Sequence, residues 1–67
     1  MEKRQWRIRS SEEVERALFE LGQDEYKVRR DDRLAGKFLT VEAEPGDWPH
    51  VEGLLSQAAP GAEPLGG

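Results

Sequence analysis

Few residues in this 67-residue chain are of types that do chemistry, and most of those are carboxylates. The sequence has fourteen Asp and Glu residues, one His and no Cys. A nucleophilic thiol is therefore absent, and a single imidazole falls short of the usual zinc and copper ligand sets. As a general base, His50 would need an acid to orient it and a pocket to act in. It follows Trp48 and Pro49 where a helix is expected to start, so we interpret it as a partly exposed surface residue.

The carboxylates do not form a pattern typical of a catalytic or metal site. Asp31 and Asp32 are adjacent, but the alternating acids, central Gly and terminal Glu of a calcium loop are missing around them. Four of the carboxylates fall on the surface of a predicted helix, where they are solvated and interact favourably with the positive N-terminal end of the helix dipole: Glu12, Glu13, Glu15 and Glu20. We therefore predict a non-enzymatic protein with no catalytic residue, no metal site and no cofactor.

The basic residues gather in the first half of the chain. All ten Lys and Arg residues lie at or before Lys37, whereas residues 38–67 carry five carboxylates and no base. The net charge of −4 disfavours nucleic acid and anionic membranes as partners, because each phosphate contact needs a cation. Residues 1–6 have no apolar run behind their charges, so we expect neither a signal peptide nor a membrane span. The expected location is the cytoplasm.

The first half of the chain reads as a strand followed by a helix. Residues 5–9 alternate, so Trp6 and Ile8 face one way while Arg7 and Arg9 face the other. Ser10 and Glu13 have the spacing of a capping box. The apolar stripe of the helix comprises Val14, Ala17, Leu18 and Leu21, and Gly22 is predicted to end it in a left-handed conformation.

The second half reads as two strands, a helix and a short terminal segment. Residues 25–29 and 37–44 alternate, with Tyr26, Val28, Leu39, Val41 and Ala43 facing inward. Residues 30–36 are polar and end in Gly, which predicts a loop. Asp47 is a predicted N-cap for a helix that runs from Trp48 to Pro60. Residues 62–67 are expected to form either a short edge strand or a frayed tail. A strand here has to lie at the edge of the sheet, because Pro64 cannot donate to a ladder.

This order predicts a single α+β domain over residues 1–67. A strand, a crossover helix and a parallel strand, with a third strand inserted between them, form a ferredoxin-like two-layer sandwich. The elements run β-α-β-β-α, followed by the terminal segment. The expected strand order is terminal segment, first, third, second, with both helices on one face of the sheet.

The sheet face without helices is the predicted interaction surface. We expect Arg7, Arg9, Lys27, Arg29 and Phe38 to form one contiguous exposed face on which a protein partner docks. Pairing of the first and third strands is expected to place Arg7 near Glu42 and Arg9 near Thr40. Such a pairing also suits an ordinary solvated sheet face, which is the alternative interpretation of these residues.

A second copy of the chain is another expected occupant of that face. A domain of this size buries only about 60% of the surface of its unfolded chain, so a homodimer or larger homo-oligomer would relieve a thin core. The spare apolar side chains expected at such an interface are Phe19, Leu34, Leu55 and Phe38. The sequence thus predicts a binding or regulatory module that acts through protein–protein contact, including self-association.

Two short resemblances supply the alternatives. Residues 36–41, Gly-Lys-Phe-Leu-Thr-Val, resemble the third-strand motif of RNA-recognition-motif domains, which implies single-stranded RNA stacked on Phe38. That motif has aromatic residues where this chain has Thr40 and Glu42, and nucleic acid is not the expected partner. The terminal Leu65-Gly66-Gly67 resembles the tail of ubiquitin-like carrier proteins, which implies activation of the last glycine as an adenylate. Those families begin with a hairpin, whereas this chain begins with a strand that leads into a helix.

Overall fold

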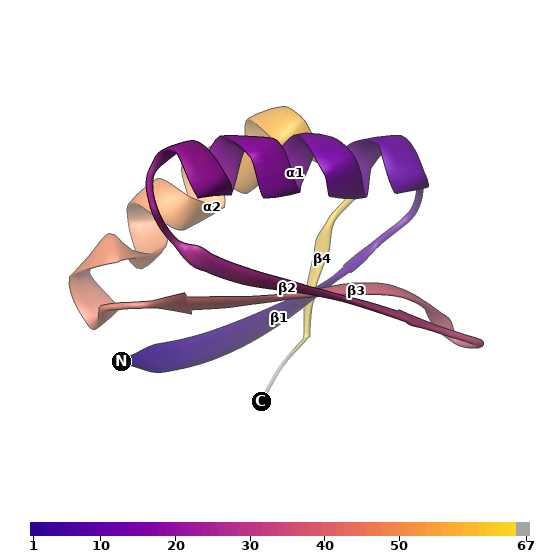
Figure 1. The fold of residues 1–67 in the computed structure, drawn as a ribbon, viewed down its shortest axis with the longest axis horizontal. Helices are drawn as coiled ribbons and strands as arrows, with labels where there is room; N and C mark the ends of the chain where they lie inside the picture. The colour runs from indigo at the N-terminus through magenta and orange to yellow at the C-terminus, as the bar shows by residue number, and fades with distance from the viewer. Residues whose placement is uncertain (66–67) are drawn as a thin grey trace.

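Two helices pack on one face of a four-stranded antiparallel sheet in the computed structural model of the chain (Figure 1). The structure describes residues 1–65. The strands are β1 (Glu2–Ile8), β2 (Lys27–Arg33), β3 (Gly36–Ala43) and β4 (Glu63–Leu65). The helices are α1 (Ser11–Gln23) and α2 (Trp48–Ala58), with a short 3-10 helix, η1 (Pro45–Asp47), before α2.

The α+β two-layer sandwich predicted from the sequence is confirmed. The strands lie in the order β2-β3-β1-β4, which is the expected order. For the terminal segment, the edge-strand alternative is correct over residues 63–65, and Pro64 lies in that edge strand. Gly66 and Gly67, on which the carrier alternative depends, lie outside the described residues.

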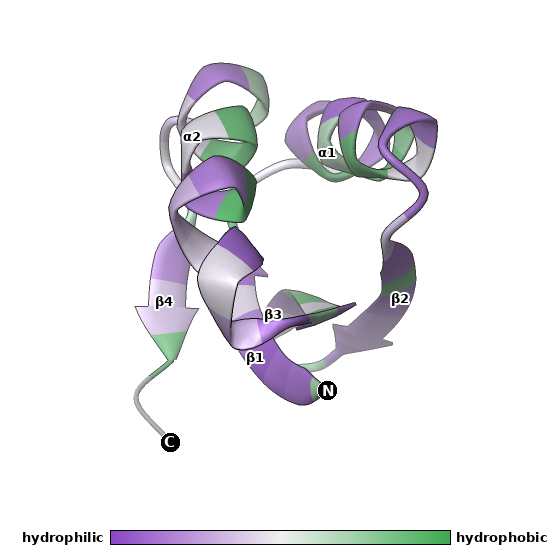
Figure 2. Cartoon of the chain, turned by 90° about the vertical axis from the view of Figure 1, so that its left-hand side faces the viewer, coloured by the Kyte–Doolittle hydropathy of each residue, from purple (hydrophilic) through white to green (hydrophobic). Residues whose placement is uncertain are grey.

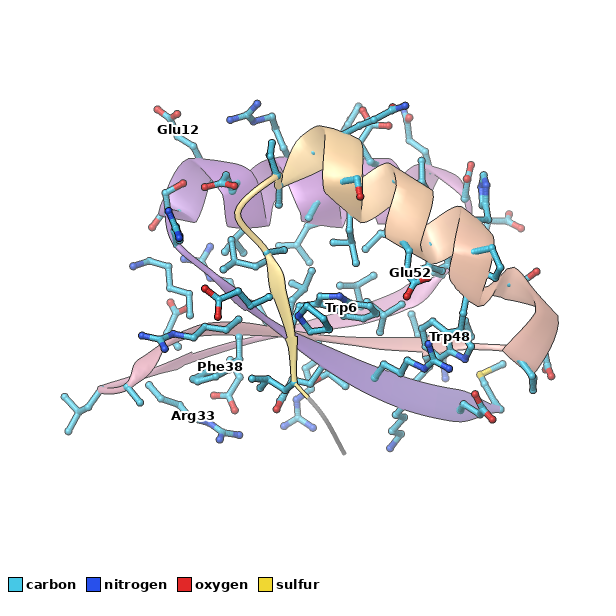
Figure 3. All side chains as sticks on the ribbon, turned by 180° about the vertical axis from the view of Figure 1, so that it is seen from behind. Trp6, Glu12, Arg33, Phe38, Trp48 and Glu52 are labelled. Carbon is cyan, nitrogen blue, oxygen red and sulfur yellow. The ribbon has the colours of Figure 1, made fainter. Side chains whose placement is uncertain are left out.

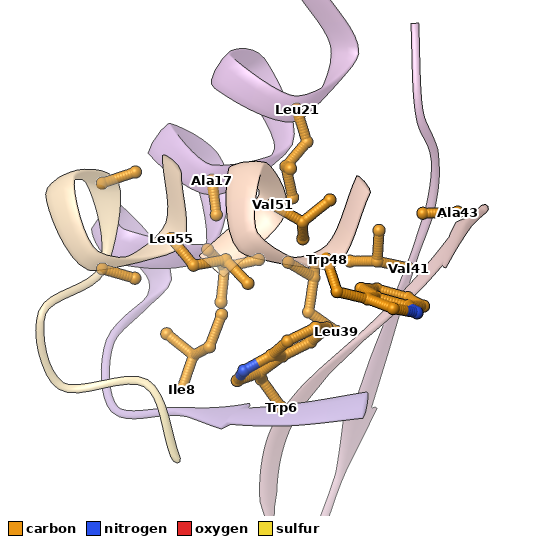
Figure 4. Packing of buried hydrophobic residues seen from close by; sticks show 13 residues of the cluster. Trp6, Ile8, Ala17, Leu21, Leu39, Val41, Ala43, Trp48, Val51 and Leu55 are labelled. Atoms are coloured by element: carbon orange, nitrogen blue, oxygen red, sulfur yellow. The ribbon is translucent and has the colours of Figure 1, made fainter. Parts of the chain in front are cut away.

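The core fills the space between the helices and the sheet (Figure 4). It contains the inward-facing residues predicted from the two periodicities, and Leu21, Leu39, Val14, Val41 and Val51 are its largest fully buried side chains. In Figure 2 the hydrophobic segments of α2 turn toward α1 and the sheet. Tyr26 and Val28 lie at the margin of this core, where they are half-buried.

Ser10 caps α1 as predicted, but the Glu13 carboxylate has other partners than the Ser10 backbone N–H that completes a capping box. The Ser10 hydroxyl accepts a hydrogen bond from the Glu13 backbone N–H at 3.2 Å. One Glu13 carboxylate oxygen accepts from the Ser10 hydroxyl, and the other accepts from the Gly61 N–H at 3.2 Å. Through the bond from Gly61, Glu13 therefore holds the segment before β4 against the start of α1.

The prediction that Gly22 ends α1 in a left-handed conformation is wrong. The helix continues to Gln23, and Glu25 has the positive φ of 65°. The Glu25 N–H donates to the Gly22 carbonyl and the Tyr26 N–H donates to the Leu21 carbonyl, which is the pattern of a Schellman motif. In that motif the left-handed residue directly precedes an apolar residue that packs back on the helix. Tyr26 is that residue, so the position falls on Glu25.

Replacing Glu25 with Gly is expected to stabilise the fold by about 0.5–1 kcal/mol. A left-handed conformation costs a residue with a Cβ roughly 1–2 kcal/mol, and the larger backbone entropy of unfolded Gly offsets part of that gain. Urea unfolding measures the difference. Glu25→Ala is the matched control, because it removes the carboxylate and keeps the Cβ, so its stability should stay within about 0.5 kcal/mol of the original. Equal stabilisation by both variants would show that the carboxylate, and not the backbone, is responsible.

The predicted loop over residues 30–36 is also wrong, because β2 continues to Arg33. The connection is a turn at Leu34 and Ala35, and Gly36 opens β3 with a φ of 143°. The polar residues suit a strand because alternate ones pair on each face. Arg30 lies 3.2 Å from Asp32 on one face, and Arg33 lies 2.6 Å from Asp31 on the other.

The register of β1 against β3 differs from the expected one. Arg7 lies opposite Phe38, Gln5 opposite Thr40 and Lys3 opposite Glu42, so the predicted pairing of Arg7 with Glu42 and of Arg9 with Thr40 is wrong. The strand begins at Glu2 and ends at Ile8, because Ser10 already caps α1. The second half of β3 therefore pairs with residues 2–4, which lie outside the strand that the sequence pattern predicts.

Candidate functional site

The sheet face away from the helices brings together side chains from all four strands; we call it the open face. Residues directly opposite each other in an antiparallel pair share a face, so the register defines its members. They are Lys3, Gln5 and Arg7 from β1; Lys27, Arg29, Asp31 and Arg33 from β2; Phe38, Thr40 and Glu42 from β3; and Glu63 and Leu65 from β4.

Charge is unequally divided between the open face and the rest of the molecule. The open face holds five of the ten cations and three of the fourteen carboxylates, a formal charge of +2. The remaining residues hold five cations and eleven carboxylates, a formal charge of −6. An acidic chain thus presents one cationic surface, which its net charge of −4 conceals.

Phe38 lies on the open face but is not exposed, so that part of the prediction is wrong. Only 8% of the residue is accessible. The Arg33 guanidinium lies 5.2 Å from the centre of the ring (Figure 3). Arg7 and Asp31 lie opposite Phe38 on the neighbouring strands. Long polar side chains can cover an aromatic ring with their aliphatic stems while their charged ends stay in water. The ring is therefore closed to stacking by a base.

Arg9 does not belong to the open face. It follows the last residue of β1, and its Cδ would lie 3.1 Å from a Cβ placed on Gly61. Its side chain thus lies against the connection between α2 and β4. Of the five predicted residues, the structure brings Arg7, Lys27, Arg29 and Phe38 onto one face and leaves Arg9 at its end.

The open face is hollowed between β1, β2 and β3. The shallow hollow has a volume of about 500 Å³ and is lined by Lys3, Gln5, Lys27, Val28, Arg29, Asp31, Arg33, Thr40 and Glu42. Arg33 is paired with Asp31, and the Gln5 side-chain amide donates to the Thr40 hydroxyl at 3.2 Å. Among residues 1–65, no carboxylate oxygen lies within 4.0 Å of the charged nitrogens of Lys3, Lys27 or Arg29. These three charges remain available to a ligand.

Sequence reasoning missed Lys3 and Arg33 because it drew the strands too short. Lys3 has the same parity as Gln5 and Arg7, so extending the alternation toward the N-terminus would have placed it on the open face. Arg33 is an even number of residues from Lys27 and Arg29, so a longer strand would place it on the same face. It also lies two residues after Asp31, and opposite charges at that spacing can pair on one face of a strand.

A second cluster of titratable groups joins the end of α1 to the start of α2. His50 Nε2 lies 2.6 Å from an Asp24 carboxylate oxygen, and the rings of His50 and Tyr26 are 6.2 Å apart. The orienting acid that the sequence did not identify is therefore present, although both side chains of the pair are substantially exposed. Partial burial raises the pKa of Tyr26, and the charges of Asp47 and Asp24 raise it further. We interpret this cluster as a structural contact at the surface that holds the end of α1 near the start of α2.

A metal site is not found in the part of the chain that the structure describes. Within it, no three His, Cys, Asp or Glu side chains come together in a way that could hold an ion. Asp31 and Asp32 belong to opposite faces of β2, and each is paired with an Arg, so they cannot bind one cation together. Over the same residues, neither helix has the length and apolar character needed to cross a membrane.

Comparison with known proteins adds no functional assignment to this geometry. No protein-family model matches the chain, and neither a curated protein nor a solved structure shows significant similarity to it.

Proposed function

We propose that the chain is a small non-enzymatic binding module that docks an acidic surface of a protein partner on its open face. The observation that carries this proposal is the concentration of unpaired cations on one side of an acidic molecule. Charges placed in this way steer and orient a partner more than they add to its affinity. The cytoplasmic location expected from the sequence is part of the proposal.

The form of the open face favours a local patch of carboxylates over a nucleic acid. Arg29 can hold a carboxylate through two parallel hydrogen bonds, and Lys3 and Lys27 add point charges around the same hollow. A long polyanion would also meet the −6 carried by the rest of the molecule. With Phe38 covered, RNA would lose the stacking contribution of roughly 1–3 kcal/mol per base.

The proposal predicts salt-sensitive binding of an acidic peptide to the open face. The probe is a fluorescent oligoglutamate peptide, with an oligoglutamine peptide of the same length as the neutral control, and fluorescence anisotropy measures the affinity. Arg29→Glu should weaken oligoglutamate binding roughly tenfold, because it puts a like charge in the hollow. Arg16→Glu makes the same change of charge on α1 and should weaken it less than about twofold.

Three results would contradict this function. Equal loss of binding in Arg29→Glu and Arg16→Glu would show that only net charge matters. Tighter binding of a single-stranded RNA of comparable charge than of oligoglutamate would replace the acidic protein surface with nucleic acid as the partner. Retention of oligoglutamate binding by the Arg29→Glu variant would place the site elsewhere.

A further inference from the structure

The outer surface of α1 carries an exposed aromatic side chain surrounded by acidic residues. The apolar stripe of the helix faces the core, and Phe19 faces away from it with 63% of its surface accessible. A shallow hollow of about 340 Å³ at this place is lined by Glu12, Glu15, Arg16 and Phe19. We call these four residues the α1 outer face. It has a formal charge of −1, and the half-buried Glu20 beside it adds a further negative charge.

The α1 outer face and the open face lie on opposite sides of the molecule. Figure 3 shows Glu12 projecting above α1 and Arg33 on the far side of the sheet. The two surfaces have opposite charge. One of them is a helix with a projecting ring, and the other is a hollowed sheet whose Lys27 and Arg29 lack a carboxylate partner among residues 1–65.

We infer that a second copy of this chain docks its α1 outer face on the open face, which makes the molecule a head-to-tail self-associating module. This inference rests on the proposed function and names the acidic partner. Phe19 would lie against the cations of the hollow, where the face of an aromatic ring attracts Lys and Arg. Glu12 and Glu15 would supply the carboxylates that Lys27 and Arg29 lack. Helices already pack against the other face of this sheet in the same layered manner.

The placement of the two surfaces determines the form of the assembly. A contact between two different surfaces is heterologous. After each copy is added, one end of the row still has an unoccupied open face and the other end an unoccupied α1 outer face. Copies therefore add in a row and do not stop at a dimer. The outer side of a three-to-four-turn helix buries less area than a standard interface, so we expect weak association that appears only at high protein concentration.

Sedimentation of the full chain across a dilution series tests this inference. The average mass should rise continuously with concentration and fall when salt is added, because opposite charges form the contact. Two variants disable one surface each: Glu15→Gln with Phe19→Ala on α1, and Lys27→Gln with Arg29→Gln on the sheet. All four positions are exposed, and circular dichroism should show both variants folded.

The mixture of the two variants gives the decisive result. Each variant alone should remain a monomer at concentrations where the original chain associates. An equimolar mixture should form a species of twice the monomer mass and nothing larger, since it contains one intact open face and one intact α1 outer face. A mixture that stays monomeric would show that the open face and the α1 outer face do not bind each other. An original chain that stops at a dimer would show a symmetric contact. Either result would overturn the inference.

The failure of this inference can be told apart from the failure of the proposed function. If the original chain stays monomeric at every concentration while oligoglutamate still binds near Arg29, the self-association is wrong and the open face keeps its acidic partner. If neither self-association nor oligoglutamate binding is seen, both are wrong.

Discussion

Replacing Trp48 with Ala is expected to leave much of the protein unfolded at room temperature. Removal of a buried Trp costs about 3–5 kcal/mol, whereas a domain of this size has a total stability of roughly 3–10 kcal/mol. The side chain is 3% exposed, and its ring centre lies 6.0 Å from that of Trp6. Its indole N–H donates to a Glu2 carboxylate oxygen at 2.6 Å, and Arg4 lies 4.5 Å above the ring. Trp48 thus holds the start of β1 against the start of α2.

Urea unfolding followed by circular dichroism measures this effect without relying on the fluorescence of the residue that is changed. Phe19→Ala is the matched control, because it truncates an aromatic side chain that is 63% exposed, and at low concentration it should shift stability by less than about 0.5 kcal/mol. Trp48→Phe keeps a ring in the core and loses the N–H, for which we expect a cost of about 1–2 kcal/mol. A Trp48→Ala variant as stable as the Phe19→Ala variant would refute the packing around Trp48.

Replacing Phe38 with Ala should destabilise the protein by about 2–3 kcal/mol, although Phe38 is not part of the core between helices and sheet. The residue is only 8% exposed, so truncation removes nearly a full aromatic side chain from its packed surroundings. Arg7 and Arg33 can partly fill the space that is left, because they are long and flexible, and this places the effect below that of Trp48. The Arg33 guanidinium would also lose the ring face on which it lies.

The same unfolding experiment checks this value against a neighbour on the same strand and face. Thr40→Ala should shift the free energy of unfolding by less than about 1 kcal/mol, since it removes a half-buried hydroxyl and a methyl group. Phe38→Leu should recover most of the lost stability. If Phe38→Ala instead left stability unchanged and abolished oligoglutamate binding, Phe38 would be an exposed contact group, as the sequence alone had suggested.

The core and the strand order could be predicted because the pattern of apolar residues records which side of each element avoids water. Trp6 and Ile8 alternate with charged residues, and Leu39 and Val41 alternate with polar ones, so each pair identifies an inner face. The helices repeat with the other period, and all the stripe residues of α1 from Val14 to Leu21 are buried or half-buried. With two helices on one side, few strand orders remain.

The register and the turns could not be predicted, because each depends on an interaction that no local pattern records. The turn at Leu34 and Ala35 has neither Gly nor Asn at its central positions, and the glycine follows it. The end of α1 depends on where Tyr26 packs, which moves the left-handed position to Glu25. An error in these two places was enough to extend the predicted loop and shorten β2.

The candidate site could be predicted only in part, because the alternation of residues shows which side chains share a face and nothing more. Alternation places Arg7, Lys27 and Arg29 on a common face, and the structure agrees. Alternation cannot show what covers a residue on that face, so it predicts an exposed Phe38 where the residue is buried. Parity alone places Arg9 on the same face, whereas the cap at Ser10 ends the strand at Ile8.

β1 begins opposite Ala43, at the end of the sheet away from the hairpin turn at Leu34 (Figure 1), and β4 lies beside β1 with Leu65 opposite Gln5. A tag or a fused domain placed before β1 would therefore leave the hairpin turn clear. Neighbouring first and last strands suit circular permutation, in which a linker joins them and new ends open at an exposed loop. Opening the chain between Leu34 and Ala35 would keep every strand whole.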